Sequence, residues 1–308
     1  MRHFLCLNDL GADGIITQLD RADQFKKTRG TTGAGRPLAG KSVALIFEKA
    51  STRTRLSLEV AVAELGGHPV VLTSAGSQLG RGEPISDTAK VLTRMVHAVT
   101  VRTFGQERVA ELAQHCSIPV LNALTDLYHP MQLLADLQTV RAVKGTLKGL
   151  KYAWIGDGNN KANSWIEAAG LLGLDLTVAC PAGFDPDAAT LREAIARGGR
   201  IQIVRDPKIA AQSAHVISTD VWASMGQEAE QAARAATFKG MGVTQALLDL
   251  ATKDVVVLHC LPAHRGEEID ADVIDGPRSF VWDQAEARLH TSKAVLTWAM
   301  GLDGSNAG

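Results

Sequence analysis

Short apolar runs alternate with helix-like patterns along almost the whole chain. Runs of strand length lie at 41–47, 69–73, 98–104, 119–124, 151–156, 174–180, 200–205, 215–219 and 254–259. Segments with helical spacing lie at 53–65, 107–116, 130–144, 160–173, 187–198, 243–251 and 286–300. This rhythm predicts an α/β fold with doubly wound parallel sheets, each covered by helices on both faces.

The length of the chain predicts two domains, because 308 residues exceed the size at which one core usually stops growing. The polar, Gly-containing segment 144–149 follows a long helical pattern and is the expected linker. We therefore predict a first domain over 1–146 and a second over 147–285. Two stretches rich in small residues, 73–82 and 222–242, are candidate lids, although a flexible surface loop is the commoner outcome.

The composition is that of an ordinary globular protein, with 45% hydrophobic and 21% charged residues. A net charge of −1 gives no overall field that favours nucleic acid or an anionic membrane as a partner. No stretch reaches the roughly 18 apolar residues of a membrane span, and the apolar run near the N-terminus is too short to predict secretion. Four scattered cysteines without CxxC spacing indicate reduced thiols in a cytoplasmic protein: Cys6, Cys116, Cys180 and Cys260.

The pentapeptide Ser51-Thr52-Arg53-Thr54-Arg55 stands where a buried strand passes into a helix. Its hydroxyls therefore fall at the helix N-terminus, where unpaired backbone N–H groups and the positive end of the helix dipole point outward. Hydroxyls and guanidinium groups at such a position favour a phosphate site. An ordinary Ser/Thr cap with solvated arginines is the alternative.

Further polar residues follow other strands of the first half, at the edge where open α/β sheets bind ligands. Arg102 closes an apolar strand, although a structural ion pair would explain it equally well. His129 precedes Pro130, which suits the first position of a helix, so His129 and Gln132 would lie together at the helix mouth as neutral donors. A capping or core histidine is the alternative for His129.

Three segments of the second half carry candidate chemistry. The turn 156–160, Gly-Asp-Gly-Asn-Asn, lacks the third glycine of a dinucleotide fingerprint, which argues against NAD. Its two Asn residues suit an amino-acid head group or an Asx-type cap. Asp220 ends a strand and could anchor an ammonium group. Cys260 ends an apolar run beside His259, but adjacent strand residues point to opposite faces, so His259 cannot readily activate the thiol; a zinc site is weakly indicated.

Taken in order, S-T-R-T-R, H-P-x-Q, G-D-G-N-N, D-V-W-x-S-M-G, H-C-L-P-x-H-R-G and Gln284-Ala-Glu-Ala-Arg288 resemble the ornithine carbamoyltransferase family of the aspartate/ornithine carbamoyltransferase superfamily. The motifs span the chain from about residue 3 to about 300. The resemblance implies a transferase of arginine metabolism that moves the carbamoyl group of carbamoyl phosphate to the δ-amine of L-ornithine, giving L-citrulline and phosphate. It also implies a carbamoyl phosphate domain, an ornithine domain and an active-site cleft between them.

The resemblance assigns roles to individual residues. The implied carbamoyl phosphate ligands are Ser51, Thr52, Arg53, Thr54, Gln78, Arg102, His129, Gln132, the backbone carbonyl of Leu261, and Arg288. The implied ornithine ligands are Asn160, Asp220, Ser224, Met225 and Cys260. Arg102, His129, Asp220 and Cys260 are the implied catalytic residues. The leaving phosphate is a plausible proton acceptor, so we expect no metal and no organic cofactor. Met131 and Gln106 depart from the family pattern.

The resemblance further implies a homotrimer, or a multiple of trimers, in which Gln78 completes a neighbouring subunit's site, and a C-terminal helix, 286–303, that returns to the first domain. Carbamoyl transfer to putrescine or to an acylated ornithine is one alternative function. A non-catalytic ligand-binding homologue is another. The intact Asp220 and Ser224-Met225 favour L-ornithine, because putrescine has no carboxylate and an acylated nitrogen is no longer an ammonium group.

Overall fold

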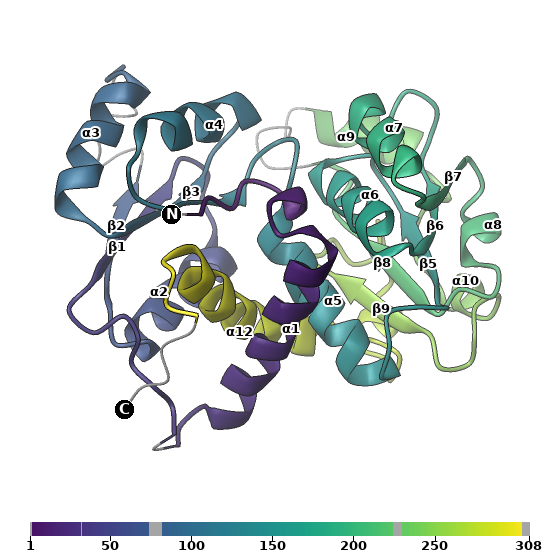
Figure 1. The fold of residues 1–308 in the computed structure, drawn as a ribbon. Helices are drawn as coiled ribbons and strands as arrows, with labels where there is room; N and C mark the ends of the chain where they lie inside the picture. The colour runs from purple at the N-terminus through teal and green to yellow at the C-terminus, as the bar shows by residue number, and fades with distance from the viewer. Residues whose placement is uncertain (1, 32, 74–81, 224–229, 304–308) are drawn as a thin grey trace. The chain divides into compact units, whose positions relative to one another are not determined.

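The computed structural model describes residues 2–31, 33–73, 82–223 and 230–303 (Figure 1). The chain forms two compact units, Met1–Gln138 with Glu286–Gly308, and Thr139–Ala285. The helices α5 (Pro130–Lys144) and α12 (Val281–Ala299) each contribute residues to both units. These units reflect compactness alone, so the functional boundary predicted after residue 146 stays a prediction.

The first unit is built on a four-stranded, wholly parallel sheet of order β2-β1-β3-β4, of which Figure 1 labels β1, β2 and β3. Its elements are η1 (Leu7–Asp9), α1 (Gly11–Thr28), β1 (Ser42–Phe47), α2 (Thr52–Glu64), β2 (His68–Thr73), α3 (Ile85–Met95), β3 (Ala98–Arg102), α4 (Gln106–His115) and β4 (Val120–Leu124). The central strands β1 and β3 are almost continuously buried, as expected for parallel strands covered on both faces. In α12, Trp298 packs edge-on against Phe4, with ring centroids 6.3 Å apart.

The second unit holds a five-stranded parallel sheet of order β7-β6-β5-β8-β9. Its elements are β5 (Lys151–Ile155), α6 (Asn160–Leu172), β6 (Asp175–Ala179), α7 (Ala188–Ala196), β7 (Arg200–Val204), α8 (Pro207–Ala211), β8 (Val216–Thr219), α9 (Gln231–Thr237), α10 (Gln245–Leu248), β9 (Val256–His259) and α11 (Ala271–Ile274). Helix α6 is buried along nearly its whole length. Gly170 permits this, because a Cβ there would lie 2.7 Å from the Cα of Ala194 in α7.

The predicted α/β class with two parallel sheets is confirmed, and all nine predicted strands are present within a residue or two. Among the described helices, the sequence did not predict η1, α1, α3, α8, α9 and α11. In α1 only Ile15, Leu19 and Ala22 make an apolar stripe, which is too sparse to stand out. The stretch 222–242, predicted as a loop, contains α9, whose residues are not buried. Residues 74–81, at the centre of the other predicted loop, lie outside the described part of the chain.

None of the described helices is long and apolar enough to cross a membrane. All four cysteines lie in the described part of the chain, and none of them forms a disulfide.

Helix α7 offers a stability prediction through its N-cap. Asp187 accepts hydrogen bonds from the backbone N–H and the hydroxyl of Thr190, both at 2.8 Å, and the Thr190 N–H lowers the pKa of the Asp187 carboxyl. Asp187→Ala is expected to lower the free energy of unfolding by about 1 kcal/mol at pH 7. Because the folded-state pKa lies below the unfolded one, this contribution is complete above roughly pH 4 and is lost as pH falls through the folded-state pKa. Urea denaturation of both proteins at several pH values measures it, and a difference that grows on acidification would contradict this cap.

Candidate active site

Each sheet has one place where the chain order reverses, and ligands of open α/β proteins bind at the carboxyl ends of the strands there. In the first unit the reversal lies between β1 and β3, with Phe47 paired to Arg102 at their ends. In the second unit it lies between β5 and β8, with Ile155 paired to Thr219. The residues that follow these four strand ends include the S-T-R-T-R and G-D-G-N-N turns and Asp220.

The S-T-R-T-R turn forms the predicted helix cap. Ser51 is the N-cap of α2, and its hydroxyl accepts the backbone N–H of Thr54 at 3.1 Å. Arg55 turns away from this end, because its side chain is 52% exposed and pairs with Glu59 one turn further along α2 at 2.6 Å. Only the first arginine of the motif, Arg53, therefore remains a candidate for the predicted phosphate site.

Two buried guanidinium groups meet at one hydroxyl in the first unit. Arg288 donates to the hydroxyl oxygen of Thr54 at 2.9 Å, and Arg102 approaches the same oxygen at 3.5 Å. Arg288 also donates to the side-chain oxygen of Gln132 at 2.7 Å. We call these three residues, with Gln132 and Asp136, the Thr54 cluster. Two cations held together in a buried setting favour an anionic ligand.

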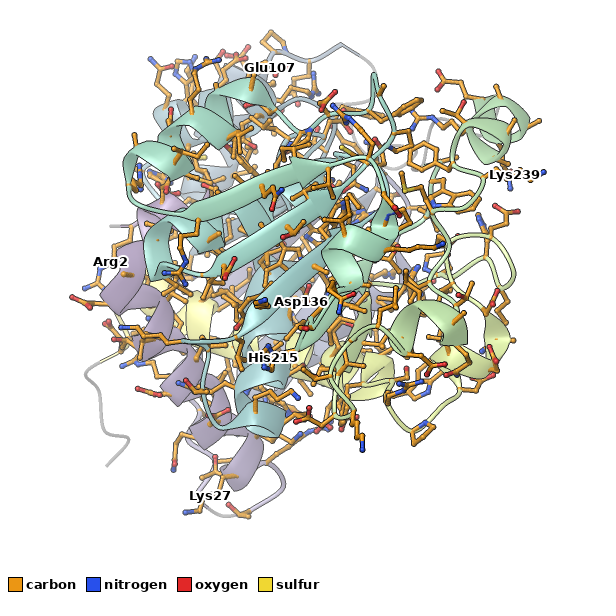
Figure 2. All side chains as sticks on the ribbon, turned by 90° about the vertical axis from the view of Figure 1, so that its right-hand side faces the viewer. Arg2, Lys27, Glu107, Asp136, His215 and Lys239 are labelled. Atoms are coloured by element: carbon orange, nitrogen blue, oxygen red, sulfur yellow. The ribbon has the colours of Figure 1, made fainter. Side chains whose placement is uncertain are left out.

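Asp136 is the member of the Thr54 cluster that the sequence analysis missed. It is fully buried on α5 (Figure 2), where its carboxylate accepts the side-chain N–H of Gln132 at 2.9 Å. Charged side chains are ordinarily exposed, as are three others labelled in the same view: Lys27, Glu107 and Lys239. An aspartate four residues after Gln132 on a helix was too weak a signal by itself, because it gains meaning only once Gln132 is placed. Asp136 orients the Gln132 amide so that its oxygen faces Arg288.

His129 lies at the start of α5, as predicted. Its side chain is buried, and its backbone carbonyl accepts the N–H groups of Gln132 at 3.1 Å and Leu133 at 3.2 Å.

The two departures from the family pattern are both structural here. Met131 is buried in the core. The Gln106 side-chain oxygen accepts the hydroxyl of Thr125 at 2.6 Å.

The G-D-G-N-N turn is held by its second glycine and its first asparagine. A Cβ on Gly158 would lie 2.3 Å from the backbone nitrogen of Pro186, so only glycine fits there. Asn159 caps α6 by accepting the N–H groups of Lys161 at 2.9 Å and Ala162 at 3.2 Å. The Asx-cap alternative is therefore correct for Asn159, whereas Asn160, the residue predicted to bind ligand, is the first residue of the helix.

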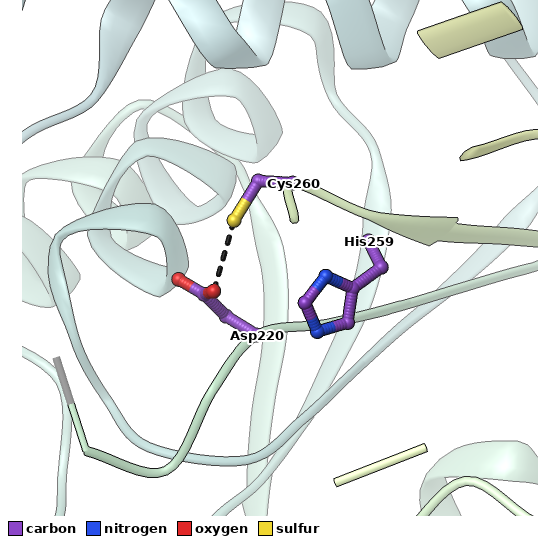
Figure 3. Close-up of side chains that lie close together, drawn as sticks. All are labelled: Asp220, His259 and Cys260. Atoms are coloured by element: carbon purple, nitrogen blue, oxygen red, sulfur yellow. Dashed lines mark hydrogen bonds between the residues drawn. The ribbon is translucent and has the colours of Figure 1, made fainter. Parts of the chain in front are cut away.

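Asp220 and Cys260 come together as the strand register requires. Thr219 pairs with His259, so the next residues of β8 and β9 are neighbours, and the Cys260 thiol donates to the Asp220 carboxylate at 2.9 Å (Figure 3). Asn159 donates to the other oxygen of the same carboxylate at 3.2 Å. We call Asn159, Asp220 and Cys260 the Asp220 cluster. It presents a carboxylate at a strand end, which suits a cationic amine.

His259 does not touch the thiol, as predicted. Its ring turns aside from the Cys260–Asp220 contact (Figure 3), and its Nε2 bonds the Glu268 carboxylate at 3.0 Å. Donor atoms of Asp220, His259 and Cys260 lie within 4.8 Å of one another, as do those of His264, Glu267 and Glu268. A cation at the first group would have to break the existing bonds of the His259 ring and of the thiol. That group is therefore poorly prepared to hold a resident metal.

Arg234, which the sequence analysis also missed, ties the 222–242 stretch to the G-D-G-N-N turn. It donates to the Asp157 carboxylate at 2.9 Å and to the backbone carbonyl of Trp222 at 3.0 Å. Burial raises the pKa of Asp157, Arg234 opposes that rise, and the nearby Asp220 carboxylate adds to it. No sequence signal singled out Arg234, because it lies in a stretch predicted to be a loop.

The remaining predicted residues divide into two groups. Gln78, Ser224 and Met225 lie outside the described residues. Leu261 follows the Asp220 cluster and adopts a φ of +58°, in the left-handed region that favours glycine. The roles assigned to all these residues stay predictions.

Comparison with known proteins is independent of this geometry. Residues 2–142 match the family model "Aspartate/ornithine carbamoyltransferase, carbamoyl-P binding domain", and residues 148–299 match its "Asp/Orn binding domain". An ornithine carbamoyltransferase of Geobacter sulfurreducens is 55% identical over 304 residues, covering 97% of this chain and 99% of that protein. One from Acidothermus cellulolyticus is 54% identical over 309 residues, covering 99% and 98%.

A solved structure, the ornithine carbamoyltransferase from Pyrococcus furiosus, matches the present fold with a TM-score of 0.92 and 48% identity, covering 97% of both chains. The first family model covers the S-T-R-T-R and H-P-x-Q motifs, and the second covers the G-D-G-N-N and H-C-L-P motifs and Arg288. The chain therefore belongs to the aspartate/ornithine carbamoyltransferase family.

Proposed function

We propose that this protein transfers the carbamoyl group from carbamoyl phosphate to the δ-amine of L-ornithine, giving L-citrulline and phosphate. The observation that carries the proposal is the pair of buried arginines, Arg102 and Arg288, that meet at the Thr54 hydroxyl beside the N-terminus of α2. Cationic groups and a helix N-terminus together favour a phosphorylated substrate. The near full-length identity to ornithine carbamoyltransferases supports ornithine as the acceptor.

The phosphate of carbamoyl phosphate would bind at the start of α2. The N–H groups of the first helical turn, the hydroxyls of Ser51 and Thr52, and the Arg53 guanidinium surround the place where the dipole favours negative charge. Arg288 adds a second cation from α12. These groups stabilise the phosphate both as part of the substrate and as it leaves with a further negative charge.

The carbonyl of the carbamoyl group would face Arg102, His129 and the Thr54 hydroxyl. During attack, the nitrogen lone pair of ornithine forms a bond to the carbonyl carbon and negative charge collects on the carbonyl oxygen. Donors fixed in advance around that oxygen lower the barrier. The bond from carbon to the phosphate oxygen then breaks, phosphate leaves with the electron pair, and the amine proton passes to the phosphate. Gln132 and the carbonyl of Leu261 would hold the carbamoyl NH₂ group.

The ornithine would bind at the Asp220 cluster. Asp220, Asn160, Ser224 and Met225 would hold its α-amino and carboxylate groups, and Cys260 with Asp220 would direct the δ-amine. Only the neutral amine carries the lone pair that attacks. Holding both substrates in one orientation supplies a large part of the rate.

We also propose that the protein works as a homotrimer, or a multiple of trimers, in the cytoplasm, with Gln78 completing a neighbouring site. Leu56 and Met95, which are 62% and 73% exposed, are the most exposed large apolar side chains among the described residues, and both lie in the first unit. A subunit contact formed by the first unit would be expected to cover both side chains.

Citrulline formation from carbamoyl phosphate tests the function, with ornithine, putrescine and N-acetylornithine run in parallel. Saturable turnover with ornithine alone is expected, because putrescine has no α-carboxylate and N-acetylornithine has no α-ammonium group. Turnover with another amine instead would retain the carbamoyl phosphate assignment and replace the acceptor. A folded protein that binds carbamoyl phosphate without turning over any amine would support a ligand-binding homologue.

A further inference from the structure

The four residues that lead into His129 form a closed loop, which we call the Thr125 loop (residues 125–128). The Thr125 N–H donates to the Tyr128 carbonyl at 2.9 Å, and the Tyr128 N–H donates to the Thr125 hydroxyl oxygen at 3.1 Å. The Tyr128 carbonyl belongs to the peptide group that joins Tyr128 to His129. The first of these bonds therefore fixes the plane of the peptide from which His129 continues.

The Thr125 hydroxyl is fully buried and uses its whole hydrogen-bonding capacity, which is one proton and two lone pairs. The proton is donated to the side-chain oxygen of Gln106 at 2.6 Å, whereas the Tyr128 carbonyl is a more distant acceptor at 3.4 Å. The oxygen accepts the Tyr128 N–H and, at 3.4 Å, the side-chain amide of Asn122. A buried hydroxyl that is satisfied in this way holds one orientation, and so does the loop that it closes.

Gln106 presents its oxygen to Thr125 because its nitrogen is engaged elsewhere. The Gln106 amide nitrogen donates to the Leu5 carbonyl at 3.3 Å, and Asn122 donates to the same carbonyl at 2.9 Å. Asn122 also donates to the Gln106 oxygen at 3.3 Å. Turning the Gln106 amide over would place its NH₂ against the NH₂ of Asn122, so the surroundings fix which end faces Thr125.

The Thr125 loop is bonded to the end of β3 as well as to His129. The Asp126 N–H donates to the Phe104 carbonyl at 2.7 Å, and the Thr103 N–H donates to the Leu124 carbonyl at 3.0 Å. Phe104 and Thr103 directly follow Arg102, the last residue of β3. One short loop thus connects the backbone beside Arg102 with the backbone of His129.

We propose that Thr125 and Gln106 are positioning residues for carbamoyl transfer, which hold the Thr125 loop and so set His129 in register with Arg102. This inference rests on the proposed function, in which His129 and Arg102 face the carbonyl of the carbamoyl group. Neither Thr125 nor Gln106 touches a substrate. They act through the peptide group between Tyr128 and His129.

The consequence of losing the Thr125 hydroxyl follows from these bonds. The Tyr128 N–H and the Gln106 oxygen would both lose a buried partner, and the loop would relax to find others. His129 moves with the peptide that precedes it. A shift of about 1 Å in a group that stabilises the transition state can cost on the order of 100-fold in rate.

Two substitutions of Thr125 separate the hydroxyl from the shape of the side chain. Thr125→Val keeps the shape and removes the hydroxyl, whereas Thr125→Ser keeps the hydroxyl and removes a methyl group. The proposal predicts that kcat of the Val variant falls about 100-fold, while the Ser variant stays within about threefold of the wild type. The KM for ornithine should stay within about twofold in both, because the lost interaction serves the transition state.

Thr100→Val is the matched control, since it makes the same change at another buried threonine. Thr100 lies in β3 and is 1% exposed, and its hydroxyl has no hydrogen-bond partner in the part of the chain that the structure describes. Replacing an unpaired hydroxyl by a methyl group is nearly neutral, so kcat should remain within about twofold of the wild type.

Gln106→Met tests whether Gln106 acts through the Thr125 hydroxyl. Methionine has a similar length but offers no amide oxygen, so kcat should fall about tenfold. The double variant with Thr125→Val should be no more than about threefold slower than Thr125→Val alone, because both changes break the same bond. Losses that multiply would show that the two residues act independently.

Amide hydrogen exchange at Tyr128, followed by NMR, gives a readout that needs no turnover. The Tyr128 N–H loses its acceptor in Thr125→Val and keeps it in Thr125→Ser. Exchange should therefore be at least about fivefold faster in the Val variant than in the Ser variant.

A loss of kcat in Thr125→Val that is absent from Thr125→Ser and Thr100→Val, with faster Tyr128 exchange, would support the proposal. Equal kcat in the two Thr125 variants, an equal loss in Thr100→Val, multiplying losses in the double variant, or unchanged Tyr128 exchange would overturn it. If the wild type makes no citrulline, the proposed function fails, and the Tyr128 exchange rates still decide whether the Thr125 hydroxyl holds this loop.

Discussion

Arg53→Ala is expected to lower kcat/KM for carbamoyl phosphate by about 1,000-fold, the upper range for losing one preorganised charge-stabilising donor. Arg53 stands in the first turn of α2, directly after the Ser51 cap. It is not among the buried residues, and the cap bond from Thr54 to Ser51 does not involve its side chain. The substitution thus removes positive charge beside the phosphate and leaves the fold intact. Steady-state citrulline formation at varied carbamoyl phosphate, with circular dichroism of the variant, measures both effects.

Arg55→Ala is the matched control for this experiment. It removes the same side chain from the same helical turn, but Arg55 is half exposed and already paired with Glu59. An exposed pair of this kind contributes little, so kcat/KM should change by less than about threefold. Similar losses of kcat/KM in both variants would mean that phosphate binding depends on the total positive charge of the first turn of α2 rather than on Arg53 alone. Near-wild-type kinetics in Arg53→Ala would show that the phosphate does not bind at the N-terminus of α2.

The parallel strands could be predicted because burial on both faces leaves a continuous apolar run that needs no tertiary information. The same holds for the cap at Ser51, where hydroxyls stand between a strand pattern and a helix pattern. The family motifs placed Asp220 and Cys260 in one site, but not in contact, since residues 40 positions apart meet only once the register of β8 and β9 is known. In each case the prediction used a local pattern or a known family.

The residues that support these sites could not be predicted from local patterns. Asp136 acts through Gln132, and Thr125 acts through Tyr128, so each has meaning only after its partner's place is fixed. Arg234 lies on a short helix whose side chains are not buried and which therefore shows no apolar stripe. Asn159 was read together with Asn160 as one recognition element, although the cap geometry separates them.

Asp220→Asn is expected to raise KM for ornithine by about 100-fold and to lower kcat, because removing one partner of a desolvated charge pair costs roughly 2–5 kcal/mol. The Asn side chain keeps the shape, but its single oxygen can accept only one of two present bonds, from Asn159 at 3.2 Å or from the Val221 N–H at 2.9 Å, because these go to different carboxylate oxygens of Asp220. It loses the negative charge and one of the two acceptor oxygens. The KM for carbamoyl phosphate should stay near the wild-type value, since the Thr54 cluster is unchanged. Initial rates over a grid of both substrate concentrations separate the two constants.

Asp185→Asn removes a carboxylate from the same unit without touching the Asp220 cluster, and so controls for net charge. Asp185 is 48% exposed and pairs with Arg205 at 2.6 Å on the surface, so both KM values should remain within about twofold of the wild type. If Asp220→Asn instead raised KM for carbamoyl phosphate and spared ornithine, the carboxylate would serve the donor substrate. The ammonium group of ornithine would then need another partner, and Asp157 is one carboxylate near Asp220, although it already pairs with Arg234 at 2.9 Å. Comparing the changes in the two KM values therefore tests which substrate binds at the carboxyl end of β8.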